Sequence, residues 1–220
     1  MTFKGWPTTA LEFYAGLEVD NSKAYWTAHK SVYEDDVRAP FLALSEAVEK
    51  EFGPLRVFRP YRDTRFSKDK TPYKTQAAAV TEGQGGTHYY VMIGAEGLYA
   101  GSGYYQLVPD QLERFRAAVA DNRSGPKLDA AVAALRKKHY SVDARESLKR
   151  VPRGFDADSP RADLLRMKGM HVGREFGTPK WLHSAAALER ITNAWRDAAP
   201  VNRWLDRHVG PSTEAPPEPD

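Results

Sequence analysis

Apolar residues in the first fifty positions of the chain recur with the spacing of a helix. Phe, Leu, Val and Phe at positions 41, 44, 48 and 52 lie three or four residues apart, so they share one helix face. Pro40 suits the first turn of this helix, and Gly53 suits its end. Shorter sets of apolar residues with the same helical spacing follow residue 9 and residue 20. We therefore expect the chain to begin with helices.

The spacing then changes to one that favours strands. Residues 57–66 mix aromatic residues, Thr and Arg, which is typical of an extended segment, and residues 77–81 form a short apolar run. Residues 88–93 and 98–105 flank the sequence Gly-Ala-Glu-Gly at 94–97, which predicts a hairpin. Together these segments predict an antiparallel sheet of about four or more strands.

Helical patterns return after the strands, at residues 110–119, 128–138, 159–168, 184–195 and 201–208. Pro200 separates the last two of them. The order of helices, sheet and helices predicts a single α+β domain over residues 1–210, with N-terminal and C-terminal helices flanking the sheet. Residues 211–220 are rich in proline and acidic residues, so we expect a disordered tail.

The composition of the 220-residue chain excludes several classes of site. It contains no cysteine, which rules out disulfides, thiolate zinc sites, iron–sulfur clusters and cysteine nucleophiles. Its six histidines show none of the HxH, HxxH or HExxH spacings of metal sites, so we expect neither a metal nor a cofactor. No apolar run approaches the roughly 20 residues that span a bilayer, and the first residues lack the apolar segment of a signal peptide. These features predict a cytoplasmic protein without a membrane partner, and they leave the oligomeric state open.

The net charge of +3 is distributed unevenly along the chain. Residues 56–74 hold seven cations against two carboxylates, and residues 145–180 hold nine against five, which gives net charges of +5 and +4. The rest of the chain therefore carries a charge of −6. Local positive potential concentrates anions in a way that the net charge of a protein does not reveal. The two basic stretches are thus the first candidates for a binding site.

The first basic stretch contains a dense run of candidate binding residues, RPYRDTRFSKDKTPYKT at residues 59–75. Guanidinium and ammonium groups are the usual donors to phosphate and carboxylate, so this run predicts a site for a small anionic ligand. The predicted donors are Arg62, Arg65, Lys68, Lys70 and Lys74. Asp63 would orient Arg65 or serve as an acid or base, and Tyr73 would supply a hydroxyl or a stacking wall. No nucleophile–base pair can be read from the spacing, so Asp63 is the only catalytic candidate and enzyme activity stays an open question.

The second basic stretch contains a tight loop, Pro-Arg-Gly at 152–154, that is rich in hydrogen-bond donors. Exposed amides at the start of the helix predicted after residue 159 can also receive an anion. We expect Lys149 and Arg153 to complete the pocket begun by residues 62–74.

Two other interpretations of the basic stretches remain open. In one, they form a nucleic-acid-binding module in which Tyr61, Phe66 and Tyr73 stack on bases. In the other, Asp63 and Asp69 neutralise the neighbouring cations, and the run only stabilises a non-catalytic interaction domain. A pocket lined by the cations would favour the small ligand, whereas a continuous basic groove would favour nucleic acid.

Two long motifs make the sequence resemble a known family. RDTRFSKDKTPYKT at residues 62–75 and LKRVPRGFDADSPRADLLRMKGM at residues 148–170 resemble motifs of domain of unknown function 2461, a widespread family of uncharacterised bacterial and fungal proteins. Asn21 and the sequence Gly-Ser-Gly-Tyr at 101–104 support the resemblance. It implies one α+β domain and no established reaction. Gln76 departs from a His that is frequent in that family after the signature Thr.

Overall fold

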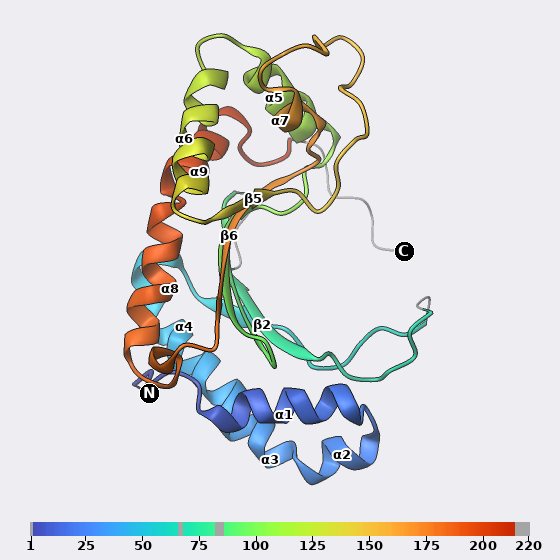
Figure 1. Ribbon diagram of the computed structural model, residues 1–220, viewed down its shortest axis with the longest axis vertical. Helices are drawn as coiled ribbons and strands as arrows, with labels where there is room; N and C mark the ends of the chain where they lie inside the picture. The colour runs from blue at the N-terminus through green and yellow to red at the C-terminus, as the bar shows by residue number, and fades with distance from the viewer. Residues whose placement is uncertain (1, 66–67, 82–85, 214–220) are drawn as a thin grey trace. The chain divides into compact units, whose positions relative to one another are not determined.

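The computed structural model of the protein describes residues 2–65, 68–81 and 86–213 (Figure 1). The chain divides into two compact units. Unit 1 comprises Met1–Glu82, Tyr89–Ala100 and Glu175–Ala194. Unit 2 comprises Gly83–His88, Gly101–Arg174 and Trp195–Asp220. In the described residues, six strands form one sheet in the order β1-β2-β3-β4-β6-β5.

Unit 1 begins with helices, as the apolar spacing predicts. They are α1 (Thr8–Val19), α2 (Lys23–Ala28), α3 (Lys30–Val32) and α4 (Ala39–Phe52), and a π-helical segment, η1 (Tyr33–Arg38), joins α3 to α4. The apolar face of α4 is buried at Phe41, Leu44 and Val48. The helix ends at Gly53, whose φ of 87° lies in a region that favours glycine.

Aromatic rings join the first helices of unit 1 into a core. The ring centre of Phe13 on α1 lies 5.8 Å from that of Trp26 on α2 and 6.0 Å from that of Tyr33 on η1. Trp26 and Tyr33 are themselves 4.8 Å apart. Buried aromatic contacts of this kind supply large apolar area together with a fixed geometry. Trp26 therefore has a fixed position, and the first basic stretch packs against it.

Four strands follow the helices: β1 (Leu55–Val57), β2 (Gln76–Thr81), β3 (His88–Gly94) and β4 (Gly97–Tyr104). β1 and β3 both pair antiparallel with β2, so that Ala79 lies opposite Val57 on one side and Val91 on the other. The predicted hairpin between residues 88 and 105 is present. Its Gly97 has a φ of 104°, and a Cβ at this position would overlap the carbonyl of Gly177, so only glycine fits.

The extended segment predicted at residues 57–66 is mostly a loop. β1 ends at Val57, and beyond it only an isolated bridge joins Tyr61 to Tyr73 in the described residues. Pro60 cannot donate to a ladder, and the side chain of Asp63 bonds a nearby backbone amide instead. Phe66 and the following residue lie outside the described residues.

Unit 2 contains the helices α5 (Pro109–Ala120), α6 (Gly125–Lys137), α7 (Ala162–Arg166) and α9 (Ala199–His208). Strand β5 (Ser141–Asp143), which the sequence patterns did not predict, pairs antiparallel with β6 (Met170–Gly177). The 3-10 helix η2 (Lys180–His183) and most of α8 (Ala186–Asp197) belong to unit 1. α5, α6 and α9 pack on one another around Phe115, Leu128 and Trp204, which are buried (Figure 1).

The predicted fold class is confirmed: the protein is an α+β protein with an antiparallel sheet that helices flank. The single-domain boundaries at residues 1–210 stay a prediction, and residues 214–220 of the predicted tail lie outside the described residues. Each helix in the described part of the chain is too short or too polar to cross a bilayer.

Candidate anion-binding sites

The signature loop, which we define as residues 59–75, is closed at its base by backbone hydrogen bonds. The amide of Arg62 donates to the carbonyl of Pro72 over 2.9 Å, and the amide of Lys74 donates to the carbonyl of Pro60 over 2.8 Å. We call residues 59–62 and 72–75 the stem of the loop, and the residues between Arg62 and Pro72 its tip.

Asn21 fastens the signature loop to the helices of unit 1. Its side-chain amide donates to the carbonyl of Tyr73 over 3.1 Å, and its side-chain oxygen accepts from the amide of Tyr73 over 3.0 Å. The ring of Tyr73 stacks on Trp26, with 4.4 Å between the ring centres and 6° between the planes. Tyr73 is only 5% exposed, so it is a core residue that offers little surface to a ligand.

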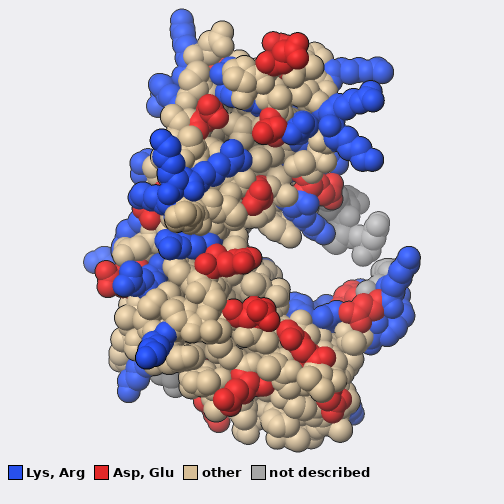
Figure 2. All heavy atoms as spheres, viewed as in Figure 1, with Lys and Arg blue, Asp and Glu red and all other residues tan. Residues whose placement is uncertain are grey.

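The aspartates at the tip of the signature loop each pair with an arginine of the loop. Arg65 donates from Nε and Nη2 to the two carboxylate oxygens of Asp63, over 3.1 and 2.8 Å. Arg62 forms an ion pair with Asp69. Figure 2 shows this loop, at the right of the view, with Lys and Arg atoms beside Asp and Glu atoms. Much of the charge that stands out in the sequence is therefore neutralised locally.

The ion pair with Arg65 further stabilises the ionised form of Asp63. Hydrogen bonds from the guanidinium and the backbone amide of Arg65 lower the pKa of Asp63 to about 2. A carboxyl group with this pKa is charged at neutral pH and poorly matched to proton transfer there. The geometry therefore favours the orienting role predicted for Asp63 over the catalytic one.

The two lysines at the tip differ in their contacts. Lys70 donates from Nζ to the backbone carbonyl of Thr64 over 2.8 Å, so it supports the conformation of the tip. Lys68 is exposed and forms no ion pair with a described residue. Both lysines are exposed, but Lys68 is the one whose ammonium group has no such contact with the loop.

The stem of the signature loop gathers three cations beside an aromatic ring. The Nζ atom of Lys74 lies 5.4 Å from the centre of the Phe58 ring, and the Lys74 side chain is half-buried. Burial, together with the nearby charges of Arg59 and Arg62, lowers the pKa of Lys74. Among these three cations, only Arg62 forms an ion pair with a described carboxylate. Arg59 and Lys74 thus form no ion pair with a described residue, although the charge of Arg59 helps to lower the pKa of Asp63.

The distal motif, residues 148–170, lies in unit 2, whereas the signature loop lies in unit 1. Lys149 and Arg153 are both exposed, and neither forms an ion pair with a described residue. Their contribution to the pocket of the signature loop stays a prediction.

Another cation of the distal motif, Arg161, has a structural role. It is only 9% exposed, and it donates from Nε to the carbonyl of Val119 over 2.7 Å and from Nη2 to the carbonyl of Ala120 over 3.2 Å. The last carbonyls of a helix lack partners within the helix, so Arg161 caps the C-terminal end of α5. It thereby fixes the turn that connects α5 to α6.

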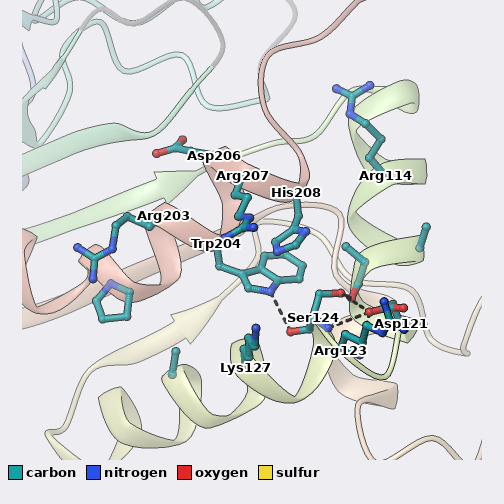
Figure 3. A pocket seen from close by; sticks show the side chains of 14 residues that line it. Arg114, Asp121, Arg123, Ser124, Lys127, Arg203, Trp204, Asp206, Arg207 and His208 are labelled. Carbon is teal, nitrogen blue, oxygen red and sulfur yellow. Dashed lines mark hydrogen bonds between the residues drawn. The ribbon is translucent and has the colours of Figure 1, made fainter.

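Unit 2 also contains a basic groove that the sequence analysis did not identify (Figure 3). Its volume is about 1260 Å³, and its walls come from α5, the turn after α5, α6 and α9. Three alanines line it, at positions 117, 118 and 131. Its cations are Arg114, Arg123, Lys127, Arg203 and Arg207.

The two carboxylates of the basic groove are engaged in other contacts. Asp121 accepts hydrogen bonds from the amides of Arg123 and Ser124, both over 2.8 Å, and so stabilises the turn. Asp206 accepts from the hydroxyl of Tyr104 over 3.0 Å. In the described residues, neither carboxylate forms an ion pair with a cation of the groove, although the charge of Arg123 helps to lower the pKa of Asp121. Five cations line the groove against these two carboxylates, so positive charge is in excess there.

Arg114 differs from the other cations of the groove because all three of its nitrogen atoms are occupied. It donates to the carbonyl of Val209 over 2.7 Å, to the carbonyl of Pro211 over 2.8 Å and to the carboxylate of Asp110 over 2.9 Å. Asp110 also accepts from the amide of Thr213 over 2.8 Å. This clamp ties the segment after α9 to α5, and in Figure 3 the Arg114 side chain points away from α6 and α9.

The pKa of His208 depends on the charges that line the groove. Its ring centre lies 4.9 Å from that of Trp204, whose Nε1 donates to the carbonyl of Ser124 over 3.0 Å. Burial and the nearby charges of Arg207 and Lys127 lower the pKa of His208. Side chains from α9 and α6 therefore lie close together here, and their charges favour the uncharged form of His208.

One sequence signal for the groove was available on α9. The residues of α9 that line the groove are three, one, three and one positions apart, so they share one face of the helix. They are Pro200, Arg203, Trp204, Arg207 and His208. Like charges four residues apart disfavour a helix slightly, which makes the pair of arginines unusual. The facing residues on α5 and α6 lie roughly 80 residues earlier, and no local pattern connects them.

The described residues contain no group of three or more His, Asp or Glu side chains that could hold a metal ion. The stem of the signature loop and the basic groove both present guanidinium and ammonium groups to a ligand. Such groups bind phosphate and carboxylate by charge-assisted hydrogen bonds.

Comparison with known proteins assigns the chain to a family. The family model for domain of unknown function 2461 (DUF2461), described as a conserved hypothetical protein, matches residues 9–204. This span contains the signature loop and the distal motif, and it ends within α9. A comparison with curated proteins found no match. With most of its length matched by the family model, the chain belongs to the DUF2461 family.

Proposed function

We propose that the protein binds a small anionic ligand, bearing a phosphate or carboxylate group, at the stem of the signature loop. The observation that carries the proposal is the backbone pairing at the base of the loop, which joins Lys74 to Pro60 and so brings its ammonium group near the charges of Arg59 and Arg62. Of these three cations, only Arg62 is paired with a described carboxylate. Like charges held close together repel one another, and a bound anion would relieve this repulsion.

The chemistry of the three cations suits such a ligand. Arg62 is held by Asp69, so its planar guanidinium approaches a ligand from a fixed direction. The Lys74 ammonium is half-buried against Phe58, and a partly desolvated charge attracts an anion more strongly than one in bulk water. Lys68 is exposed at the tip and can add a further contact.

Only some of the ligand-binding residues predicted from the sequence remain donors in this proposal. Arg65 is engaged with Asp63, and Lys70 with the carbonyl of Thr64, so both support the loop. Arg62, Lys68 and Lys74 retain the role expected of them, and Arg59 joins them.

Inorganic phosphate is the probe that tests this proposal. We expect the melting temperature to rise with phosphate at constant ionic strength, because a ligand at ten times its Kd stabilises the folded state by about 1.4 kcal/mol. In Lys74→Met, which keeps the apolar stem against Phe58 and removes the charge, we expect this rise to disappear. Lys50→Met, at an exposed position of α4, is the matched control and should respond as the natural protein does.

Two outcomes would contradict the proposal. One is that phosphate stabilises Lys74→Met as much as the natural protein. The other concerns pH: because the pKa of Lys74 is lowered, its charge is lost at a lower pH than that of an ordinary lysine. Phosphate binding that persists unchanged well above the ordinary lysine pKa of about 10.4 would therefore exclude Lys74 as a donor.

A further inference from the structure

The basic groove of unit 2 holds a set of cations without partners. Arg123, Lys127, Arg203 and Arg207 are exposed, and none of the four forms an ion pair with a described residue. The two carboxylates beside them are engaged in other contacts, as Asp121 caps the turn and Asp206 binds Tyr104. In the described residues, the groove therefore carries more positive than negative charge, which favours the binding of an anion.

The cations are presented by three different segments that the core holds in place. Arg203 and Arg207 lie on one face of α9, Lys127 lies in the first turn of α6, and Arg123 lies in the turn before α6 (Figure 3). Trp204 joins α9 to this turn through its hydrogen bond to Ser124, and it is only 7% exposed. A fixed arrangement lowers the entropy lost on binding.

The dimensions of the groove favour a polymer over a small molecule. Its volume of about 1260 Å³ is larger than the roughly 300–1,000 Å³ of small-ligand pockets, and its lining combines cations from three segments with three alanines. A chain of anionic groups offers a separate charge to each of several cations, whereas a single phosphate does not.

The side chains of the groove favour phosphate over an acidic protein partner. Three of the four cations are arginines, whose planar groups bind phosphate by paired hydrogen bonds. Protein interfaces usually depend on buried aromatic or apolar anchors. None of the large apolar side chains that are exposed in the described residues lines the groove, and Trp204 is already buried.

We propose that the basic groove of unit 2 binds the phosphate backbone of a nucleic acid through Arg123, Lys127, Arg203 and Arg207. Trp204 is not accessible for stacking, so binding depends on charge and has little base preference. This proposal goes beyond the small-ligand site of unit 1, and it holds or fails independently of that site.

Fluorescence anisotropy with a labelled oligothymidylate, a DNA duplex and an RNA duplex tests the proposal. With four phosphate contacts, the logarithm of the association constant should fall with the logarithm of salt concentration at a slope of about −3 to −4. Binding of either single strands or duplexes with this slope supports the proposal and identifies the form preferred. No binding of any of the three at low salt would overturn it.

The double variant Arg203→Gln/Arg207→Gln removes half of the proposed contacts. We expect it to weaken binding by roughly tenfold per cation at low salt and to reduce the steepness of the slope by about 1.5–2. Both residues are exposed, so the variant should remain folded, which its melting temperature will verify. The matched control is Arg136→Gln/Lys137→Gln, which removes the same charge from exposed positions of α6 that do not line the groove. Equal losses in the two variants would overturn the proposal, because they would reflect net charge alone.

Two further measurements separate this proposal from its alternatives. A glutamate peptide of the same length should compete at least about tenfold more weakly than the oligonucleotide, and equal competition would favour an acidic protein partner instead. Lys74→Met should leave nucleic-acid binding unchanged, so the groove is tested separately from the signature loop. Loss of binding in Lys74→Met would overturn the assignment to unit 2.

NMR of His208 provides a direct readout of the site. The groups around its ring are Arg207 and Lys127, which lower its pKa together with burial, and Asp121, which opposes them. A bound phosphate chain would screen the two cations, so the pKa of His208 should rise when oligonucleotide is added. An unchanged pKa at saturating oligonucleotide would overturn binding in the groove.

Discussion

The signature loop of unit 1 and the basic groove of unit 2 use their cations in opposite ways. In the tip of the loop, Arg65 and Arg62 are paired with Asp63 and Asp69 only a few residues away. In the groove, Arg203 and Arg207 have no ion pair with a described residue. The segment that is most basic in the sequence is thus the more neutralised one in the structure.

The distal motif extends this contrast. Arg161 is buried against the end of α5, and Lys168 forms an ion pair with Glu146 over 3.1 Å. The four groove cations, in contrast, all lie outside the two basic stretches of the sequence, at residues 56–74 and 145–180. A run of charge along a chain therefore predicts ion pairing as readily as binding, because neighbouring carboxylates reach the cations first.

Replacement of Arg161 tests the structural side of this contrast and should have the largest effect. Arg161→Met removes two charge-assisted hydrogen bonds to the end of α5, and we expect the free energy of unfolding to fall by about 3 kcal/mol. Urea denaturation measures this loss. Arg166→Met, which removes an exposed ion pair with Asp163 in the same motif, should change stability by less than about 1 kcal/mol. Similar losses in both variants would show that Arg161 is an ordinary surface charge.

The anchor of the signature loop should have an intermediate effect. Asn21→Ala removes both hydrogen bonds to the backbone of Tyr73 and leaves an amide and a carbonyl without these partners, so we expect a loss of about 2 kcal/mol. Chemical denaturation measures the loss, and Gln76→Ala at an exposed position is the control. An unchanged stability would mean that the stacking of Tyr73 on Trp26 holds the loop by itself.

Acid should loosen the tip of the signature loop, and this is the smallest effect. The folded-state pKa of Asp63, about 2, lies below its ordinary value of 3.8, so the contribution of the carboxylate to stability is present above pH 4 and is lost as the pH falls toward 2. The amide of Arg65, which donates to Asp63 over 3.2 Å, should report this in NMR spectra with a midpoint near pH 2. A midpoint at the ordinary value would show that the pair with Arg65 does not form in solution.

Much of the fold follows from local sequence patterns. The apolar spacing before Gly53 predicts α4, and the sequence at residues 94–97 predicts the turn between β3 and β4, since each depends on residues close together in the chain. β5 has only three residues and pairs with β6 roughly 30 residues away, so no local period reveals it. The loop at residues 59–75 departs from simple alternation because its aspartates bond backbone amides.

The candidate sites were only partly predictable, for a similar reason. The pairing of Asp63 with Arg65 could be expected from their separation of two residues, whereas the burial of Tyr73 depends on Asn21 and Trp26, roughly 50 residues earlier. The role of Arg161 depends on carbonyls roughly 40 residues earlier. Burial and pairing over such separations are properties of tertiary structure, which the charge pattern of a single segment does not contain.

The clamp formed by Arg114 has a consequence for conformational entropy. The end of a helix normally frays, because its last carbonyls have no partners within the helix. Directly after α9, however, the carbonyls of Val209 and Pro211 accept hydrogen bonds from Arg114, which ties this segment to α5 and opposes fraying. A ligand that docks on Arg203 and Arg207 would then meet a backbone that is already ordered. The entropy lost on binding would be confined to side chains and to the ligand itself.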